Sequence, residues 1–164
     1  MKVKITLVPL LVLALAAVAG AQTKISGTVV CAKPDQQQML EVGDRQGHSL
    51  MITQGKCTWS KPMEIAGTQS KEDQVTMSSD ATGNKSNGRG YGVGTMASGD
   101  KFFVRLQGVA TLKEGAIDSD DGKWTFTGGT GKVKGVKGGG TYKGKGGPEG
   151  TTYEVEGEYQ LPTK

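Results

Sequence analysis

The segment GGTGK at residues 128–132 has the composition of a phosphate-binding loop. A Walker A loop places a first glycine five positions before the Gly-Lys pair, and Ser or Thr follows the lysine. Phe126 occupies the position of that first glycine here, and Val133 follows Lys132. The sequence also lacks a G-x-G-x-x-G strand–helix unit with a downstream acidic residue. The spacing therefore excludes both kinds of nucleotide site, and we interpret the glycines as a requirement of the backbone geometry.

Five lysines are spread through residues 128–150, a segment in which 11 of the 23 residues are glycine. They form either an anion-binding patch or, as we favour, charges that keep glycine-rich strands soluble and prevent edge-to-edge pairing. These residues are Lys132, Lys134, Lys137, Lys143 and Lys145.

An acidic run at residues 118–122, DSDDG, has the composition of a calcium loop. An EF-hand loop needs acidic residues at positions 1, 3 and 5, glycine at position 6 and a glutamate at position 12. Here glycine falls at position 5 and the glutamate is missing. We therefore interpret the run as a polar hairpin turn that ends in Asp-Gly.

His48 is the only histidine, so neither a multi-histidine metal cluster nor a second catalytic imidazole is available. A single histidine can still act as an acid or base in a pocket. Because His48 follows a turn, we expect it at the surface. No residue pattern in the chain identifies a catalytic group, a metal site or a cofactor.

Two cysteines, Cys31 and Cys57, are the candidates for a disulfide. Cysteine pairs in exported proteins meet an oxidising compartment and are generally bridged. The alternative is two free buried thiols, while a catalytic or metal role is disfavoured because Cys-x-x-Cys is absent. We predict the bridge, which would stabilise the fold by about 3 kcal/mol.

Residues 1–21 have the organisation of a secretory signal peptide, with two lysines, an apolar run and small residues at Ala19-Gly20-Ala21. The alternative is an uncleaved anchor, but the apolar part is shorter than the roughly 20 residues of a membrane span. We predict cleavage before Gln22, no stable membrane anchor afterwards, and a secreted or periplasmic location. Asn84-Lys85-Ser86 would accept a glycan in a host that glycosylates.

The charge balance argues against nucleic acid as a partner. The chain has 20 basic and 16 acidic residues, and removal of Lys2 and Lys4 with the signal peptide leaves 18 against 16. A net charge of +2 is too small for a phosphate-binding surface. The oligomeric state does not follow from the sequence.

Strand patterns dominate the chain after residue 22, and no segment has a sustained apolar period of 3.6 residues. Residues 83–90 and 113–122 are polar and predict loops. At least eight short strands with short connections are typical of an antiparallel barrel or sandwich in one domain, residues 22–164. The predicted strands are 24–32, 37–42, 48–54, 73–81, 91–97, 100–112, 123–127, 139–146 and 151–161.

Alternation along these strands assigns their faces. Three glutamates share one face of 151–161 and must face water, because unpaired carboxylates are costly to bury. Tyr153 and Tyr159 then point inward. Lysines at alternate positions place Tyr142 inside, and Trp124 points inward by the same rule.

The strand 100–112 allows two assignments. One face carries Phe102, Val104, Leu106 and Ala110, and the other carries Phe103, Arg105, Gln107, Val109 and Thr111. We favour the first as the core face, which leaves Arg105 pointing outward. In a closed barrel with a polar pocket the faces would be exchanged.

The glycine-rich segment resembles a pattern of allene oxide cyclases, dirigent proteins and related secreted bacterial proteins. The similarity consists of residues 126–132, FTGGTGK, followed by Gly135 and Gly138, and it covers about 40 residues, 121–160. The resemblance implies an eight-stranded antiparallel β-barrel, calycin-like in outline, whose chain bends sharply at these glycines. It transfers no catalytic residue, because the pocket strands of those families do not align here.

Three classes of function remain open. We favour a non-catalytic barrel that holds a small apolar or aromatic ligand. The alternatives are an isomerase or cyclase in which His48 or Arg105 polarises the substrate, and a filled barrel with a structural or stress role. The aromatic residues expected to line a cavity are Trp124, Tyr142, Tyr153 and Tyr159.

Overall fold

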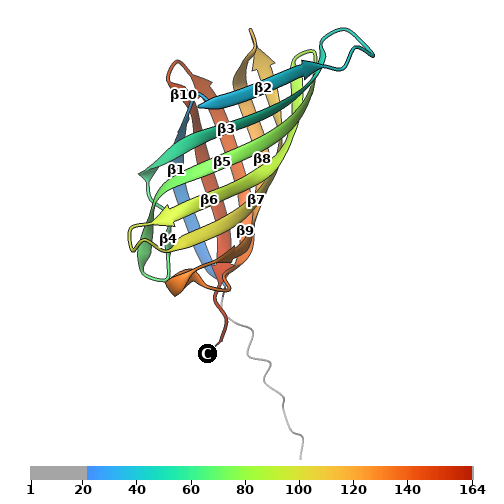
Figure 1. The fold of residues 1–164 in the computed structure, drawn as a ribbon. Coiled ribbons are helices and arrows are strands. Elements are labelled where there is room, and N and C mark those ends of the chain that lie inside the picture. Colours follow the sequence, from blue (N-terminus) through green and yellow to red (C-terminus); the bar gives the residue numbers. More distant parts are fainter. Residues whose placement is uncertain (1–21, 164) are drawn as a thin grey trace, which may run out of the picture.

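A computed structural model describes residues 22–163, which fold into a closed antiparallel β-barrel (Figure 1). The predicted signal peptide lies outside the described residues. Eight strands form the barrel: β1 (Thr23–Ala32), β3 (His48–Lys61), β5 (Thr68–Thr82), β6 (Lys85–Met96), β7 (Lys101–Lys113), β8 (Ala116–Gly129), β9 (Lys137–Gly147) and β10 (Gly150–Gln160). Two further strands are β2 (Gln36–Glu41) and β4 (Glu64–Ile65), and η1 (Gly131–Val133) is a 3-10 turn.

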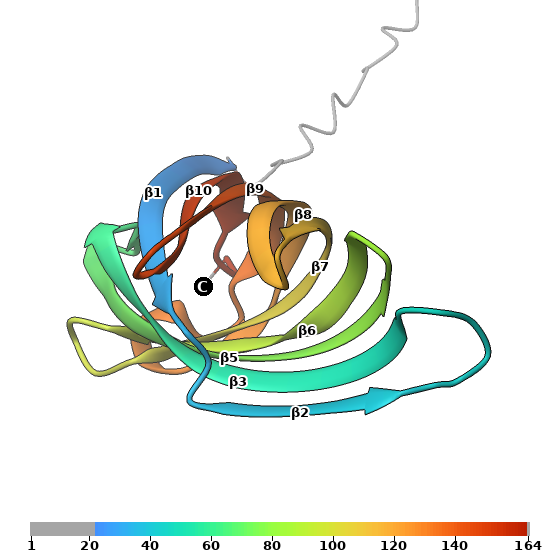
Figure 2. The same ribbon diagram turned by 90° about the horizontal axis from the view of Figure 1, so that it is seen from above.

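The barrel closes because β3 pairs with two barrel strands. The order around the wall is β1–β10–β9–β8–β7–β6–β5–β3, and β3 pairs again with β1. The first part of β3 pairs instead with β2, which extends the sheet outside the barrel (Figure 2). The prediction of an eight-stranded antiparallel barrel is thus confirmed, with β2 and β4 as additions.

Alternation sets the two faces of the wall as the sequence predicts. On β7, Phe102 and Ala110 are buried while Arg105 is exposed, so the favoured assignment is correct. Trp124 on β8 and Tyr142 on β9 are buried. The inward face therefore carries apolar and aromatic side chains, whose exposure to water is unfavourable.

The glycine-rich segment is a sharp corner between β8 and β9. Gly131 and Gly135 have φ values of +51° and +72°, which favour glycine. A Cβ at Gly131 would also collide with the carboxylate of Asp100, which accepts a hydrogen bond from the backbone N–H of Lys132 at 3.2 Å. The corner prediction is confirmed.

One end of the barrel is tightly packed. The corner and β4 lie together at the lower end of Figure 1, and they place Ile65, Val133 and Val136 in the core with at most 2% of their surface exposed. Met96 at the end of β6 is also buried there. This apolar plug closes the lower end of the barrel.

Two predicted loops are wrong. Residues 83–90 contain only a turn at Gly83-Asn84, after which β6 begins at Lys85. The pattern was hidden because the inward face of β6 consists largely of glycine, which gives no apolar period. Residues 114–115 form the next turn and β8 begins at Ala116, so the acidic run 118–122 is a strand rather than a hairpin turn.

Within residues 22–163, no helix is both long and apolar enough to cross a membrane.

Candidate functional site

A cavity of about 130 Å³ lies within the barrel, above the plug. Most of its lining is aliphatic, aromatic or sulfur-containing, and two carboxyl groups are included. The lining residues are Val29, Cys31, Cys57, Trp59, Met63, Asp73, Val75, Met77, Phe102, Val104, Leu106, Asp120, Trp124, Tyr142, Tyr153 and Val155. The site is therefore an apolar chamber with two acidic positions.

Glycines on the wall leave room for the aromatic rings. A Cβ at Gly122 would overlap the Tyr142 ring, and a Cβ at Gly144 would lie 2.5 Å from the Tyr153 ring. The two tyrosine rings meet edge to face with their centroids 5.6 Å apart. The rings therefore lie close to the wall.

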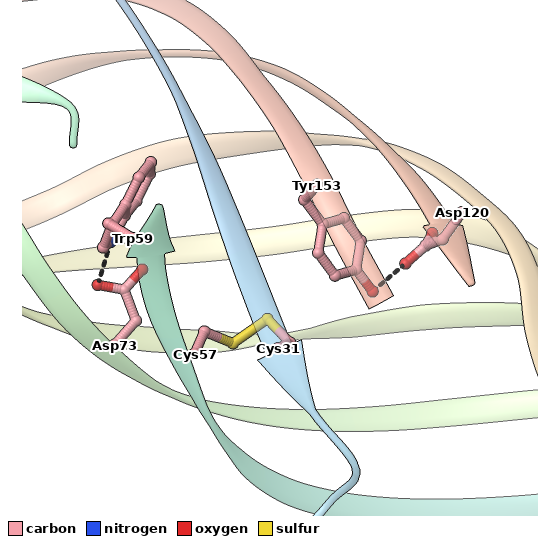
Figure 3. Close-up of a disulfide and its surroundings, with 6 residues drawn as sticks. All are labelled: Cys31, Cys57, Trp59, Asp73, Asp120 and Tyr153. Atoms are coloured by element: carbon pink, nitrogen blue, oxygen red, sulfur yellow. Dashed lines mark hydrogen bonds between the residues drawn. A yellow bond between two sulfur atoms is a disulfide. The ribbon is translucent and has the colours of Figure 1, made fainter. Parts of the chain in front are cut away.

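Asp120 on β8 is the first acidic position. The hydroxyl of Tyr153 donates a hydrogen bond to its Oδ2 at 3.2 Å (Figure 3). Burial raises the pKa of the Asp120 carboxyl, and this effect exceeds the opposing effect of the tyrosine hydrogen bond. Burial and the nearby Asp120 raise the pKa values of Tyr142 and Tyr153, so both phenols are neutral donors at physiological pH.

Asp73 on β5 is the second acidic position. The indole Nε1–H of Trp59 donates to its Oδ1 at 3.0 Å (Figure 3). Burial raises the pKa of the Asp73 carboxyl to about 6, although the indole hydrogen bond acts in the opposite direction. A carboxyl group with this pKa changes its charge close to neutral pH.

The disulfide between Cys31 and Cys57 is part of the same lining, so the predicted bridge is confirmed. The two cysteines are opposite each other on β1 and β3, and Cys57 is opposite Asp73 on β5. Figure 3 shows the bridge near the Trp59–Asp73 pair. The bond indicates an oxidising environment outside the cytoplasm.

The structure brings three of the predicted site residues together, since Trp124, Tyr142 and Tyr153 all line the cavity. Tyr159 also belongs to the inward face but lies at the packed end, where its hydroxyl accepts a hydrogen bond from the Ala66 N–H at 3.1 Å. Arg105 lies on the outer wall, in a shallow groove with Tyr91.

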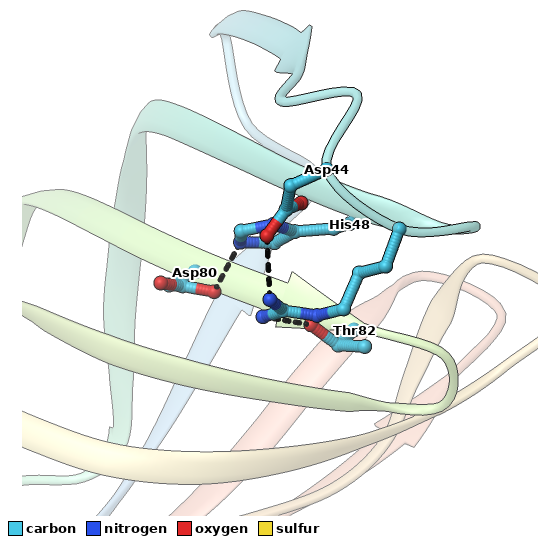
Figure 4. Close-up of polar contacts among 5 residues, drawn as sticks. Asp44, His48, Asp80 and Thr82 are labelled. Carbon is cyan, nitrogen blue, oxygen red and sulfur yellow. Dashed lines mark hydrogen bonds and ion pairs between the residues drawn. The ribbon is translucent and has the colours of Figure 1, made fainter.

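His48 is buried, with 9% of its surface exposed, so the expected surface position is wrong. The β2–β3 loop folds over the imidazole: its Nδ1 contacts Asp44, and its Nε2 lies 3.1 Å from Asp80 (Figure 4). The hydrogen bond to His48 lowers the pKa of the Asp44 carboxyl. His48 is not part of the cavity lining and instead holds the loop against β5.

Among the aromatic and acidic lining residues, the sequence patterns did not indicate Trp59, Asp73 and Asp120. Asp73 shares its face with Val75 and Met77, so strict alternation along β5 would have placed it inside. Asp120 fell in a predicted loop, and Trp59 lay beyond the predicted end of its strand. Within the described range, 22–163, no cluster of three or more metal-ligating side chains occurs.

Comparison with solved structures finds four similar chains, including the following two. One is a protein of unknown function of the DUF3224 family from Shewanella oneidensis MR-1, with a TM-score of 0.53 and 15% identity over 87% of this chain and 100% of that one. The other is pyocyanin demethylase, with a TM-score of 0.44 and 18% identity over 80% of this chain and 98% of that one. No protein-family model and no curated protein matches the sequence. The likeness to the DUF3224 protein shows the fold alone, and the activity stays unassigned.

Proposed function

We propose that the barrel binds a small, largely apolar molecule with one ring in its central cavity. The observation that carries this proposal is the cavity of about 130 Å³ with a mainly apolar and aromatic wall. An engineered apolar cavity of about 150 Å³ in another protein is large enough to hold benzene. The volume therefore supports a ligand with one ring and a short substituent.

The tryptophans provide a direct test. The chain has two tryptophans, and both Trp59 and Trp124 line the cavity. Titration with toluene or benzyl alcohol should therefore give a saturable change in intrinsic fluorescence and a rise in the thermal midpoint. Ligand at 100 times its Kd stabilises the folded state by about 2.7 kcal/mol.

A matched pair of variants locates the binding. Val75→Phe fills the cavity and should abolish the fluorescence change. Val93→Phe makes the same replacement on the outer face of the neighbouring strand and should leave binding intact. Absence of a response to either ligand in the unmodified protein, or equal binding by both variants, would contradict the proposal.

A second candidate is a proton-transfer enzyme, favoured by the pKa of about 6 for the buried Asp73 carboxyl. A general base works best when its pKa is near the operating pH. Asp73 would take a proton from a carbon next to a carbonyl, whose oxygen accepts the electron pair, and would then return a proton to carbon. The test is NMR of acetophenone in D2O, which measures deuterium entering the methyl group next to the carbonyl. We expect exchange with the unmodified protein and with the control Glu72→Gln, but not with Asp73→Asn. Exchange by the unmodified protein no faster than in buffer alone would eliminate this candidate.

We also infer export and membership of the allene-oxide-cyclase-like superfamily. The signal-peptide pattern of residues 1–21 and the disulfide support a secreted or periplasmic location. The glycine corner within an eight-stranded barrel supports the superfamily. Mass measurement of the chain purified from its own source should show an N-terminus at Gln22.

A further inference from the structure

The charges of the cavity are one-sided. Among the described residues, 22–163, its lining contains two carboxyl groups, Asp73 and Asp120, and no lysine, arginine or histidine. Each carboxyl accepts one hydrogen bond from a neighbouring aromatic residue, from Trp59 and Tyr153 respectively. In an apolar wall an ionised carboxylate is costly unless a cation or further donors approach it. A ligand that is positive or rich in N–H groups would lower this cost.

Both carboxyls have an oxygen left for such a partner. Among residues 22–163, no protein donor reaches Oδ2 of Asp73 or Oδ1 of Asp120. No buried side-chain oxygen in that range lacks a partner, so these two oxygens are accessible rather than sealed in the wall. An ionised carboxylate has about four acceptor positions, and most of them are free here.

The aromatic lining favours the same kind of ligand. Indole and phenol faces attract cations, and the attraction increases when water is excluded. Trp59 and Trp124 lie on the wall with Tyr142 and Tyr153. An anionic ligand of the same shape would meet two carboxylates and the negative faces of these rings.

We propose that the cavity selects one-ring amines over neutral and anionic molecules of the same shape, with Asp73 accepting hydrogen bonds from the ammonium group and Asp120, on another part of the lining (Figure 3), adding a second negative charge. This inference rests on the proposed binding function and specifies its ligand class. The carboxylates provide the attraction for the amine and the repulsion for the anion, which are the two parts of specificity.

The selectivity depends on pH through Asp73. Its neighbours Cys57 and Trp59 on β3 and Gly94 on β6 do not ionise in this range. An amine stays protonated between pH 5 and 7.5, whereas a carboxyl with a pKa of about 6 is mostly neutral at pH 5. The other titratable groups near Asp73 or in the lining are Glu72, Asp120, Tyr142 and Tyr153.

The test compares benzylamine, benzyl alcohol and benzoate by tryptophan fluorescence and calorimetry. At pH 7.5 we expect benzylamine to bind at least ten-fold more tightly than benzyl alcohol, and benzoate at least ten-fold more weakly. Benzylamine affinity should fall up to about ten-fold at pH 5, because only about a tenth of a carboxyl with a pKa of about 6 is ionised at that pH. Benzyl alcohol affinity should stay constant.

Variants identify the acceptors. Asp73→Asn and Asp120→Asn should each reduce the amine preference at least three-fold, and the double variant should remove it while still binding benzyl alcohol. Glu72→Gln and Asp121→Asn remove neighbouring exposed charges, whose effect on the pKa values of Asp73 and Asp120 is smaller than the effects of burial and hydrogen bonding, and should change the amine preference less than about two-fold. Equal affinity for benzylamine and benzyl alcohol, or a preference that survives in the double variant, overturns the amine inference and leaves the binding function standing. Failure of all three ligands to bind overturns both.

Discussion

The packed end and the hollow middle of the barrel are built from the same strands and the same alternation, yet they differ in content. At the packed end, β4 and the glycine corner add side chains from outside the wall, and Ile65 and Val133 have 0% of their surface exposed. In the middle no element of residues 22–163 enters the barrel in this way, and the tyrosine rings lie against glycines of the wall. Closure of the barrel does not by itself fill it, and the plug separates the part that stabilises the fold from the part that is free to bind.

The largest effect should come from emptying the packed end. Ile65→Ala removes a side chain that is fully buried and should lower the free energy of unfolding by about 2–5 kcal/mol. Val155→Ala, in the half-buried lining of the cavity, should cost about 1 kcal/mol because less of this side chain is removed from water on folding. Chemical denaturation measures both, and similar losses would contradict the distinction between the two regions.

The disulfide is the covalent element of the hollow region. The bond joins residues 26 positions apart, and replacing both cysteines by serine should cost about 3 kcal/mol. Denaturation with and without reductant gives the value for the unmodified protein, and the serine variant should show no effect of reductant. A loss well below 1 kcal/mol would mean that the strand pairing alone holds this part of the wall.

A methyl group added to a wall glycine tests whether the rings of the hollow region lie against these glycines. Gly144→Ala would press on the Tyr153 ring, which can turn into the cavity at the loss of its hydrogen bond to Asp120. We expect a cost of about 1–3 kcal/mol and weaker ligand binding. Gly115→Ala, at a turn with open space around it but φ of +79°, reports the backbone cost without any effect on binding. Unchanged ligand binding by Gly144→Ala would mean that the Tyr153 ring does not lie against Gly144.

The smallest effect concerns pH. The pKa of Asp73 is raised on folding from 3.8 to about 6, so the folded state holds this proton more tightly than the unfolded state. The contribution of Asp73 to the free energy of unfolding is therefore greatest below pH 4 and falls as the pH rises through 6. Asp73→Asn should remove this fall and stabilise the protein by about 1–2 kcal/mol at pH 7.5. Denaturation at pH 4.5 and 7.5 measures it, and an unchanged pH dependence would contradict the assignment.

The sequence predicted those parts of the barrel in which side chains alternate visibly. Three glutamates on one face made the orientation of Tyr153 predictable, and the corner was predictable because glycines of fixed spacing are needed there. The first half of β6 was missed because the inward face of this strand is mostly glycine, and Asp120 was placed in a loop because acidic residues are usually exposed. The cavity depends on the packing of the tyrosine rings against wall glycines on other strands. The burial of His48 depends on the β2–β3 loop, which folds over the imidazole. Both are contacts between distant residues, which local periodicity does not encode.

The disulfide between β1 and β3 also closes residues 31–57 into a covalent ring, which contains the paired residues of the β2–β3 hairpin. The tip of that hairpin, residues 43–47, is exposed and lies between the two cysteines. A protease that cuts this tip would leave two fragments that are still joined. The nicked protein would keep its intact mobility on a non-reducing gel and separate into two pieces only after reduction, so one cut in this loop need not release any part of the barrel.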